Sequence, residues 1–225
     1  MTRRLVLFDV DGTLVDSQHD IVASMTHAFE SQGLAAPTRG QTLSIVGLSV
    51  PEAIEALTPD VSDAVRAALA LEFRTGGPQQ RAPGGKQDLL YPGALETIAS
   101  LTRRDDVVLG VATGKSRRGV ARLFDRYDWH PHFKTIQTAD TNPSKPHPGM
   151  ITTAMAEVGA EPYETIMIGD TSFDMAMARA AGVTAIGVAW GYHPVADIER
   201  AGAHRIVQDY ATLLSVLDGP FALAR

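Results

Sequence analysis

The chain has 225 residues, 44% hydrophobic and 20% charged, enough to bury an ordinary core in one large domain or one domain with an insertion. Its formal net charge of −6 argues against nucleic acid as a partner. Cysteine is absent, which excludes disulfides, zinc thiolates and a cysteine nucleophile. No apolar run approaches the roughly 18 residues of a membrane span, and there is no signal-peptide core, so we expect a cytoplasmic protein without a membrane partner.

Short apolar runs that end in polar, glycine-bearing turns recur along the chain. The runs predicted as strands are 5–8, 107–112, 135–137, 165–168, 184–188 and 205–207. Helical patterns separate most of them, at 92–103, 116–127, 147–158, 172–181, 194–201 and 211–217. Because continuously apolar strands are covered on both faces, this alternation predicts an α/β fold with a doubly wound parallel sheet, a Rossmann-like core.

The stretch 17–88 breaks this alternation. Ser17, followed by Asp20, resembles a capping box and predicts an amphipathic helix that ends near Gly33. Further helix starts are expected near Thr38, Ser49 and Pro59, before a return rich in glycine and proline. We therefore predict two domains: a core formed by 1–16 and 89–225, and an all-helical cap, 17–88, inserted after the first strand.

The first predicted strand runs into Asp9-Val10-Asp11-Gly12-Thr13. Because side-chain direction repeats every two residues in a strand, we expect Asp9 and Asp11 on one face, about 6–7 Å apart. At an effective dielectric of about 20, such a pair of charges costs roughly 2–3 kcal/mol. The only nearby basic residues are Arg3 and Arg4, behind the strand. A divalent metal, with a carboxylate nucleophile beside an acid/base carboxylate, is the simplest chemistry that explains the pair.

Two later segments offer groups for an anion. Thr113 ends the second long strand, and the amides of Gly114 and the next residue lead into a helix N-terminus that favours anions. The alternative is an ordinary strand–turn–helix junction capped by Ser116. Lys145 precedes a proline-flanked histidine, and its compact ammonium suits crowded carboxylates and phosphate oxygens. The alternative for Lys145 is a solvated loop lysine.

A second acidic pair follows the fourth predicted strand. Asp170 stands at the strand end, where its carboxylate would complete a set of oxygen ligands for Mg²⁺. Asp174 lies four residues later, in the first turn of a helix. It would either join this site or simply complement the helix dipole.

Taken in order, these segments resemble the four motifs of the haloacid dehalogenase superfamily, specifically its phosphatases with a helical cap inserted after the first strand. The resemblance implies that Asp9 attacks the substrate phosphorus to form an aspartyl-phosphate. It implies that Asp11 protonates the leaving oxygen and then deprotonates the water that cleaves the intermediate. The metal ligands it implies are Asp9, Asp11 through its backbone carbonyl, and Asp170, with Asp174 supporting either the metal or the lysine. The groups it implies for the phosphoryl oxygens are Thr113 and Lys145.

Within this superfamily the chain is most similar to phosphoglycolate phosphatases, on the segments 16–17, 46–49 and 187–192. This implies Mg²⁺-dependent hydrolysis of a small phosphorylated metabolite, with 2-phosphoglycolate as the leading substrate, by a monomer or homodimer. Sugar phosphates, nucleotides, pyrophosphate and a phosphomutase of the same family stay open. The presence of Asp11 argues against dehalogenation, because a halide needs no general acid.

Specificity is expected to come from the cap and from the end of the fifth strand. Trp190 and Tyr192 would either shape the mouth of the pocket or pack as ordinary strand-end aromatics. Four arginines of the predicted cap are candidates to bind a substrate carboxylate, although we expect most of them to be solvated: Arg39, Arg66, Arg74 and Arg81.

Overall fold

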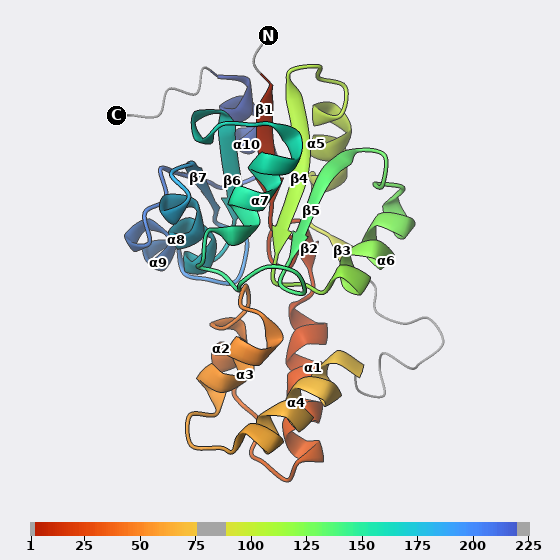
Figure 1. The fold of residues 1–225 in the computed structure, drawn as a ribbon, viewed down its shortest axis with the longest axis vertical. Helices are drawn as coiled ribbons and strands as arrows, with labels where there is room; N and C mark the ends of the chain where they lie inside the picture. Colours follow the sequence, from red (N-terminus) through yellow and green to blue (C-terminus); the bar gives the residue numbers. More distant parts are fainter. Residues whose placement is uncertain (1–2, 76–88, 220–225) are drawn as a thin grey trace.

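The computed structural model describes residues 3–75 and 89–219. Figure 1 shows a sheet flanked by helices in the upper part of the view and a separate group of helices below it. Within the described ranges, no helix combines the length and apolar character needed to cross a membrane.

Six parallel strands form the sheet, in the order β5-β4-β1-β6-β7-β8. They are β1 (Arg4–Phe8), β4 (Val107–Thr113), β5 (Phe133–Thr138), β6 (Thr165–Gly169), β7 (Thr184–Val188) and β8 (Arg205–Val207). The central strand β1 pairs with β4 on one side and β6 on the other, so that Val6 lies opposite both Leu109 and Ile166. The doubly wound parallel sheet predicted from the sequence is confirmed. Its carboxyl ends, where the order reverses at β1, form the crevice in which such folds bind ligands.

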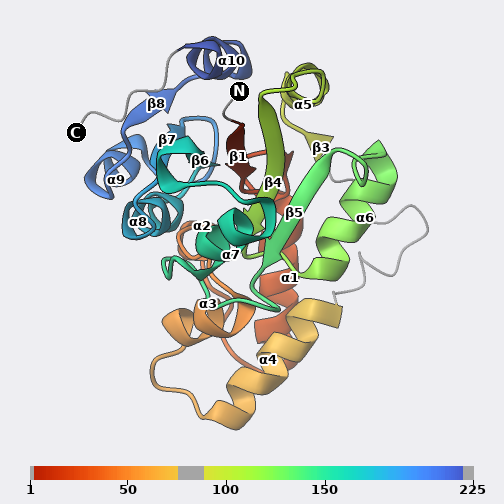
Figure 2. The same cartoon turned by 45° about the horizontal axis from the view of Figure 1, so that its top comes forward.

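Helices cover both faces of this sheet (Figure 2). They are α5 (Ala94–Leu101), α6 (Arg117–Tyr127), α7 (Gly149–Val158), α8 (Ser172–Ala180), α9 (Val195–Arg200) and α10 (Tyr210–Asp218). The alternation of side chains along β1 divides the core into two apolar clusters. Val6 and Phe8 pack with α5, α6 and α10, whereas Leu5 and Leu7 pack with α7, α8 and α9. Burial on both faces explains the continuous apolar run from which β1 was predicted.

The insertion leaves and re-enters the core through a small ribbon. β2 (Val15–Asp16) pairs antiparallel with β3 (Leu89–Leu90), a ribbon that was not predicted because two residues carry no periodicity. Between them lie α1 (Gln18–Ser31), α2 (Arg39–Leu43), α3 (Val50–Leu57) and α4 (Asp63–Thr75). The described part of the insertion is thus helical, as expected. The glycine- and proline-rich return falls outside the described residues, and the division into two domains at 17–88 stays a prediction.

The starts of these helices show which capping predictions hold. Thr38 and Gln41 form a reciprocal capping box at α2. Ser17 precedes α1, but its side chain makes no capping hydrogen bond, so the predicted capping box is wrong there. Its hydroxyl instead donates to the carboxylate of Asp11, at 2.6 Å. The side chain of Ser17 is thus engaged with the core and not with the first turn of α1.

Candidate active site

The two aspartates of the first motif lie just beyond β1 and not within it. The strand ends at Phe8, and the Asp9 amide still donates to the carbonyl of Ile168, at 2.9 Å, across the end of the sheet. The expectation of two carboxylates on one face of a regular strand is therefore wrong in detail. Both side chains nevertheless line the same cavity.

Gly12 makes the turn after this segment possible. Its φ of +85° lies in the left-handed region, and a Cβ there would stand 2.1 Å from Oδ2 of Asp170. The turn brings the hydroxyl of Thr13 within 2.8 Å of Oδ1 of Asp170, to which it donates. The backbone amide of Tyr192 donates to Oδ2 of the same carboxylate, at 2.9 Å. These contacts fix the orientation of Asp170.

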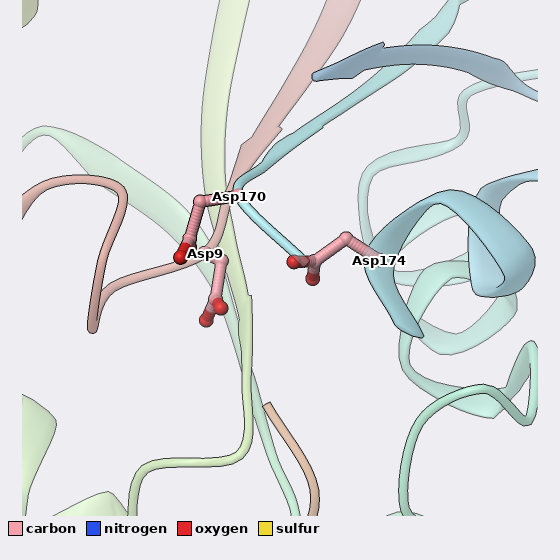
Figure 3. Close-up of side chains that lie close together, drawn as sticks. All are labelled: Asp9, Asp170 and Asp174. Atoms are coloured by element: carbon pink, nitrogen blue, oxygen red, sulfur yellow. The ribbon is translucent and has the colours of Figure 1, made fainter. Parts of the chain in front are cut away.

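Three buried carboxylates meet at the carboxyl end of the sheet: Asp9, Asp170 and Asp174. Figure 3 shows the groups of Asp9 and Asp170 side by side and that of Asp174 reaching toward them from α8. One oxygen from each lies within 4.8 Å of the others, and each residue is at most 1% exposed. The structure therefore brings together the aspartates that the motifs singled out.

Lys145 lies inside this cluster and is 1% exposed. Its Nζ is 2.6 Å from Oδ1 of Asp174 and 3.1 Å from Oδ2 of Asp9. The alternative of a solvated loop lysine is wrong for this residue. Although burial lowers its pKa, the charges of Asp174 and Asp9 raise it above the ordinary value, so Lys145 stays protonated.

One ammonium does not balance three carboxylates. Burial raises the pKa of Asp9 to about 6, against the attraction of Lys145. Burial also raises the pKa of Asp170 well above its ordinary value, and the charges of Asp9 and Asp174 raise it further. Oxygen donors with a surplus of negative charge are the ligand set that a hard divalent cation prefers. The residues present thus fit Mg²⁺.

The two carboxylate oxygens of Asp174 have different partners. Its Oδ2 accepts hydrogen bonds from the amide and the hydroxyl of Thr171, at 3.0 and 2.7 Å, while Thr171 caps the first turn of α8. Its Oδ1 accepts from Lys145. The residue therefore closes a capping box and, with its other oxygen, holds the lysine in the site.

Asp11 stands in a different environment from Asp9, on the side of the inserted helices. Its side chain is 14% exposed, and its Oδ1 accepts hydrogen bonds from Nζ of Lys115, at 2.8 Å, and from the hydroxyl of Ser17. This pairing of charges was not predicted from the sequence. The pattern around Lys115 showed only its amide at a helix start, and no sequence periodicity joins it to Asp11.

The turn after β4 meets the insertion. Thr113 is 1% exposed, and its hydroxyl accepts from the amide of Lys115, at 3.2 Å. A Cβ on Gly114 would lie 2.6 Å from the carbonyl oxygen of Leu48 and 2.7 Å from that of Gly47. Only a glycine permits this approach of the two backbones. Ser116 caps α6 through a hydrogen bond from the Gly119 amide, so the structural alternative also holds at this junction.

A cavity of about 650 Å³ lies between the sheet end and the inserted helices. Asp9, Asp11 and Thr113 form its core side, and apolar residues such as Met25 and Phe73 form its other wall. Of the arginines proposed for substrate binding, Arg74 lines this cavity. Arg39 and Arg66 bond elsewhere, to Gln18 and to the carbonyl of Thr58 respectively, and Arg81 lies outside the described residues. Arg122, on α6, also lines the cavity and was not anticipated.

The two strand-end aromatics do not line this cavity. The indole of Trp190 donates to the carbonyl of Thr13, at 3.0 Å, and its ring packs on Tyr210. Tyr192 packs against the insertion's cluster of Ile21, Leu43 and Val46. Of the two roles considered, packing is the one that the structure supports.

The pocket thus combines a buried group of carboxylates and a lysine with the carboxyl edge of a parallel α/β sheet. The chain belongs to the haloacid dehalogenase-like hydrolase family, whose model matches residues 6–188.

Curated relatives agree with this assignment. A probable phosphatase IndB from Dickeya dadantii is 32% identical, over 93% of this chain and 91% of that protein. The pyrophosphatase PpaX from Bacillus pumilus is also 32% identical, over 84% of each chain. A phosphoglycolate phosphatase from Pseudomonas fluorescens is 31% identical, over 94% of this chain and 78% of that protein.

Solved structures agree as well. A hydrolase from Pseudomonas syringae superposes with a TM-score of 0.82 and 26% identity, over 97% of this chain and 98% of that one. Family and relatives identify the chain as a phosphoric monoester hydrolase, as the motifs predicted.

Proposed function

We propose that the protein is a Mg²⁺-dependent phosphatase that hydrolyses a small phosphomonoester through a phosphorylated Asp9. The observation that carries this proposal is the buried contact of Asp9 with Lys145, beside two further carboxylates, where Asp9 and Thr113 line the cavity between the sheet and the inserted helices. Phosphoryl transfer needs positioning and neutralisation of charge more than unusual bonding. This site offers both.

The first step breaks the ester bond. An oxygen of Asp9 attacks phosphorus, and the bond between phosphorus and the ester oxygen breaks with its electron pair on that oxygen. Asp11 supplies the proton that this oxygen takes up, so an alcohol leaves and an aspartyl-phosphate remains. Lys145 and the hydroxyl of Thr113 would hold the phosphoryl oxygens, together with the amide of Gly114.

The second step restores the enzyme. The Asp11 carboxylate takes a proton from water, the water oxygen attacks phosphorus, and the bond to Asp9 breaks to release inorganic phosphate. Asp9, Asp170 and the backbone carbonyl of Asp11 would hold Mg²⁺, with Asp174 supporting the site through Lys145. When bound, the cation neutralises the phosphoryl charge and lowers the pKa of the carboxyl groups around it.

We propose 2-phosphoglycolate as the leading substrate. Several relatives carry the name phosphoglycolate phosphatase. The cavity also contains two exposed guanidinium groups, of Arg74 and Arg122, with no hydrogen-bond or ion-pair partner in the described part of the chain. Such groups suit a second anionic group on the substrate. The carboxylates of Glu52 and Asp140 line the same cavity, and Asp140 already accepts from the amide of Arg117.

Pyrophosphate stays a second candidate, because a relative that is 32% identical is named a pyrophosphatase. Its second phosphoryl group would meet the same arginines. Sugar phosphates and nucleotides stay open, as does a phosphomutase, which would return the phosphoryl group to another hydroxyl.

The test is phosphate release from 2-phosphoglycolate, pyrophosphate, glucose 1-phosphate and nucleotides, with Mg²⁺ or with EDTA. We expect Mg²⁺-dependent release that is strongest with 2-phosphoglycolate and absent from the Asp9→Asn variant. Phosphate release that persists in Asp9→Asn would show that Asp9 is not the nucleophile. A preference for pyrophosphate would overturn the substrate alone, and isomerisation without phosphate release would identify a mutase.

A further inference from the structure

A continuous hydrogen-bonded chain joins Asp170 to Asp11 through two residues outside the four motifs. The amide of Tyr192 donates to Oδ2 of Asp170, at 2.9 Å. At the other end of the same residue, the phenol oxygen lies 2.9 Å from the amide of Ser17 and 3.2 Å from its hydroxyl. The Ser17 hydroxyl then donates to Asp11, at 2.6 Å. Tyr192 thus connects the metal-binding carboxylates with the acid.

The hydrogen bonds of this network run in one direction, from Tyr192 through Ser17 to Asp11. The Ser17 amide can only donate, so the phenol oxygen accepts from it and directs its own proton elsewhere. The Ser17 hydroxyl accepts that proton and donates its own to the carboxylate. The competing acceptor for the phenol, the carbonyl of Val15, is farther away, at 3.5 Å. Burial raises the pKa of Tyr192, so the phenol remains a neutral donor.

Lys115 donates to the same carboxylate oxygen of Asp11. Its Nζ donates to Oδ1 of Asp11 at 2.8 Å, and both side chains are largely buried, with 13% and 14% exposed. The lysine follows Thr113 by two residues and lines the cavity. The ammonium of Lys115 and the hydroxyl of Ser17 both donate to Oδ1, and together they fix the direction of the Asp11 carboxylate.

The ring of Tyr192 extends this chain to the insertion. It packs on the apolar cluster of Ile21, Leu43 and Val46, which come from α1, α2 and the loop that follows α2. Its phenol meets the backbone at Ser17, the residue immediately before α1. A movement of the inserted helices would therefore act on the same side chain that supports the acid.

We propose that Tyr192 and Lys115 are positioning residues for Asp11 in the acid step, with Tyr192 acting through Ser17. The inference rests on the proposed function, because it concerns the proton that the leaving oxygen takes up. When the ester bond breaks, an alkoxide needs this proton. A p-nitrophenolate or acetate anion leaves without it. The role therefore predicts a loss that depends on the leaving group.

The experiment compares kcat/KM for 2-phosphoglycolate with kcat/KM for p-nitrophenyl phosphate and acetyl phosphate, because this ratio reports the first transfer. General acid catalysis contributes on the order of 10²–10⁴-fold, and imperfect positioning forfeits part of it. We expect Tyr192→Phe and Lys115→Met each to lose about tenfold with 2-phosphoglycolate and less than about twofold with the activated esters. Lys115→Arg should recover most of the loss, because it keeps the cation. Ser17→Ala removes the same link should Tyr192→Phe fail to fold.

Tyr210→Phe is the matched control. Tyr210 is also buried, and its phenol also donates near the site, to the carbonyl of Thr13 at 2.7 Å, but it has no part in the chain to Asp11. Removing that hydroxyl should change the values for both kinds of ester by one common factor. A purely structural role of Tyr192 or Lys115 would do the same.

The outcomes separate this inference from the function on which it rests. A wild-type enzyme that hydrolyses none of these esters, or an Asp11→Asn variant with no dependence on the leaving group, would reject the proposed function. If both behave as expected, while Tyr192→Phe and Lys115→Met lose activity equally on all esters or lose none, the positioning role is wrong. A selective loss in both variants establishes it.

Discussion

The two aspartates of the first motif stand two residues apart in environments that differ sharply. Asp9 is sealed in a cluster with Lys145, Asp170 and Asp174, where every side chain is at most 2% exposed. Asp11 lies at the rim, partly exposed, held by groups that come from the next strand end and from the start of the insertion. In the proposed mechanism the nucleophile and its cation need an invariant geometry, which the end of the sheet would provide. An acid that must meet different leaving groups is better placed where the inserted helices also contribute.

The largest effect should come from removing the cation of the sealed cluster. In Lys145→Met, the buried carboxylates of Asp9 and Asp174 lose their ammonium partner, and breaking such a pair costs about 3–5 kcal/mol. We expect turnover to fall by at least about 10³-fold, since a preorganised charge on the phosphoryl group is lost. Phosphate release measures the activity, and thermal unfolding measures the stability.

Lys134→Met is the control for this variant, because Lys134 is exposed and donates only to a backbone carbonyl, of Pro131, in the described structure. Its turnover should equal that of the wild type. Turnover above a tenth of the wild-type value in Lys145→Met would mean that the sealed cluster tolerates the loss of its cation. The buried cluster around Asp9 would then be no more sensitive to substitution than the surroundings of Asp11.

The second prediction concerns pH and Mg²⁺. Because burial raises the folded-state pKa of Asp9 to about 6 from 3.8, the metal-free folded protein binds more protons than the unfolded chain between these values. This contribution of Asp9 to the free energy of unfolding is therefore largest at low pH and is lost as pH rises to about 6, by on the order of 3 kcal/mol. The raised pKa of Asp170 acts in the same direction. Mg²⁺ should accordingly raise Tm more at pH 7.5 than at pH 5.

Differential scanning fluorimetry with and without Mg²⁺ at the two pH values tests this. In Asp9→Asn both the gain from Mg²⁺ and its dependence on pH should shrink. An equal increase in Tm at both pH values would show that the effect of Mg²⁺ on stability does not depend on ionisation of the buried carboxyl groups.

The same contrast explains how much could be inferred from sequence. Lys145 and Asp174 follow no apolar run, and they were included from their local patterns and the resemblance to the four motifs. The parallel sheet and the placing of Asp9 and Asp170 at its end were predictable because both residues follow an apolar run, and strand ends of a parallel sheet meet. The rim was not. Lys115 lies 104 residues from Asp11, and Tyr192 lies 175 residues from Ser17. Such pairs have no shared period or motif and arise only from the packing of the insertion on the core.

A third, smaller effect is expected at the contact between the turn after β4 and the loop that joins α2 and α3. In Gly114→Ala the new Cβ would come within 2.7 Å of the carbonyl oxygens of Gly47 and Leu48, so the loop between α2 and α3 must move away. We expect kcat/KM to fall about tenfold while Tm changes little, because misplacement by about 1 Å can cost up to about 10²-fold in rate. Gly40→Ala is the control, since a Cβ there meets nothing within 4 Å. An unchanged kcat/KM in Gly114→Ala would mean that the contact of the loop with the core has no part in catalysis.

The smallest effect is expected at Arg122, an exposed residue that lines the cavity. If this guanidinium binds the second anionic group of the substrate, Arg122→Gln should raise KM for 2-phosphoglycolate about fivefold, which corresponds to about 1 kcal/mol for an exposed ion pair. For p-nitrophenyl phosphate, which lacks a second anion, KM should not change. Arg118→Gln removes an exposed arginine from the same helix outside the cavity and serves as the control. An equal rise in KM for both esters would mean that Arg122 attracts phosphate esters only through its charge. Arg74 would then be the residue that binds the second anionic group of the substrate.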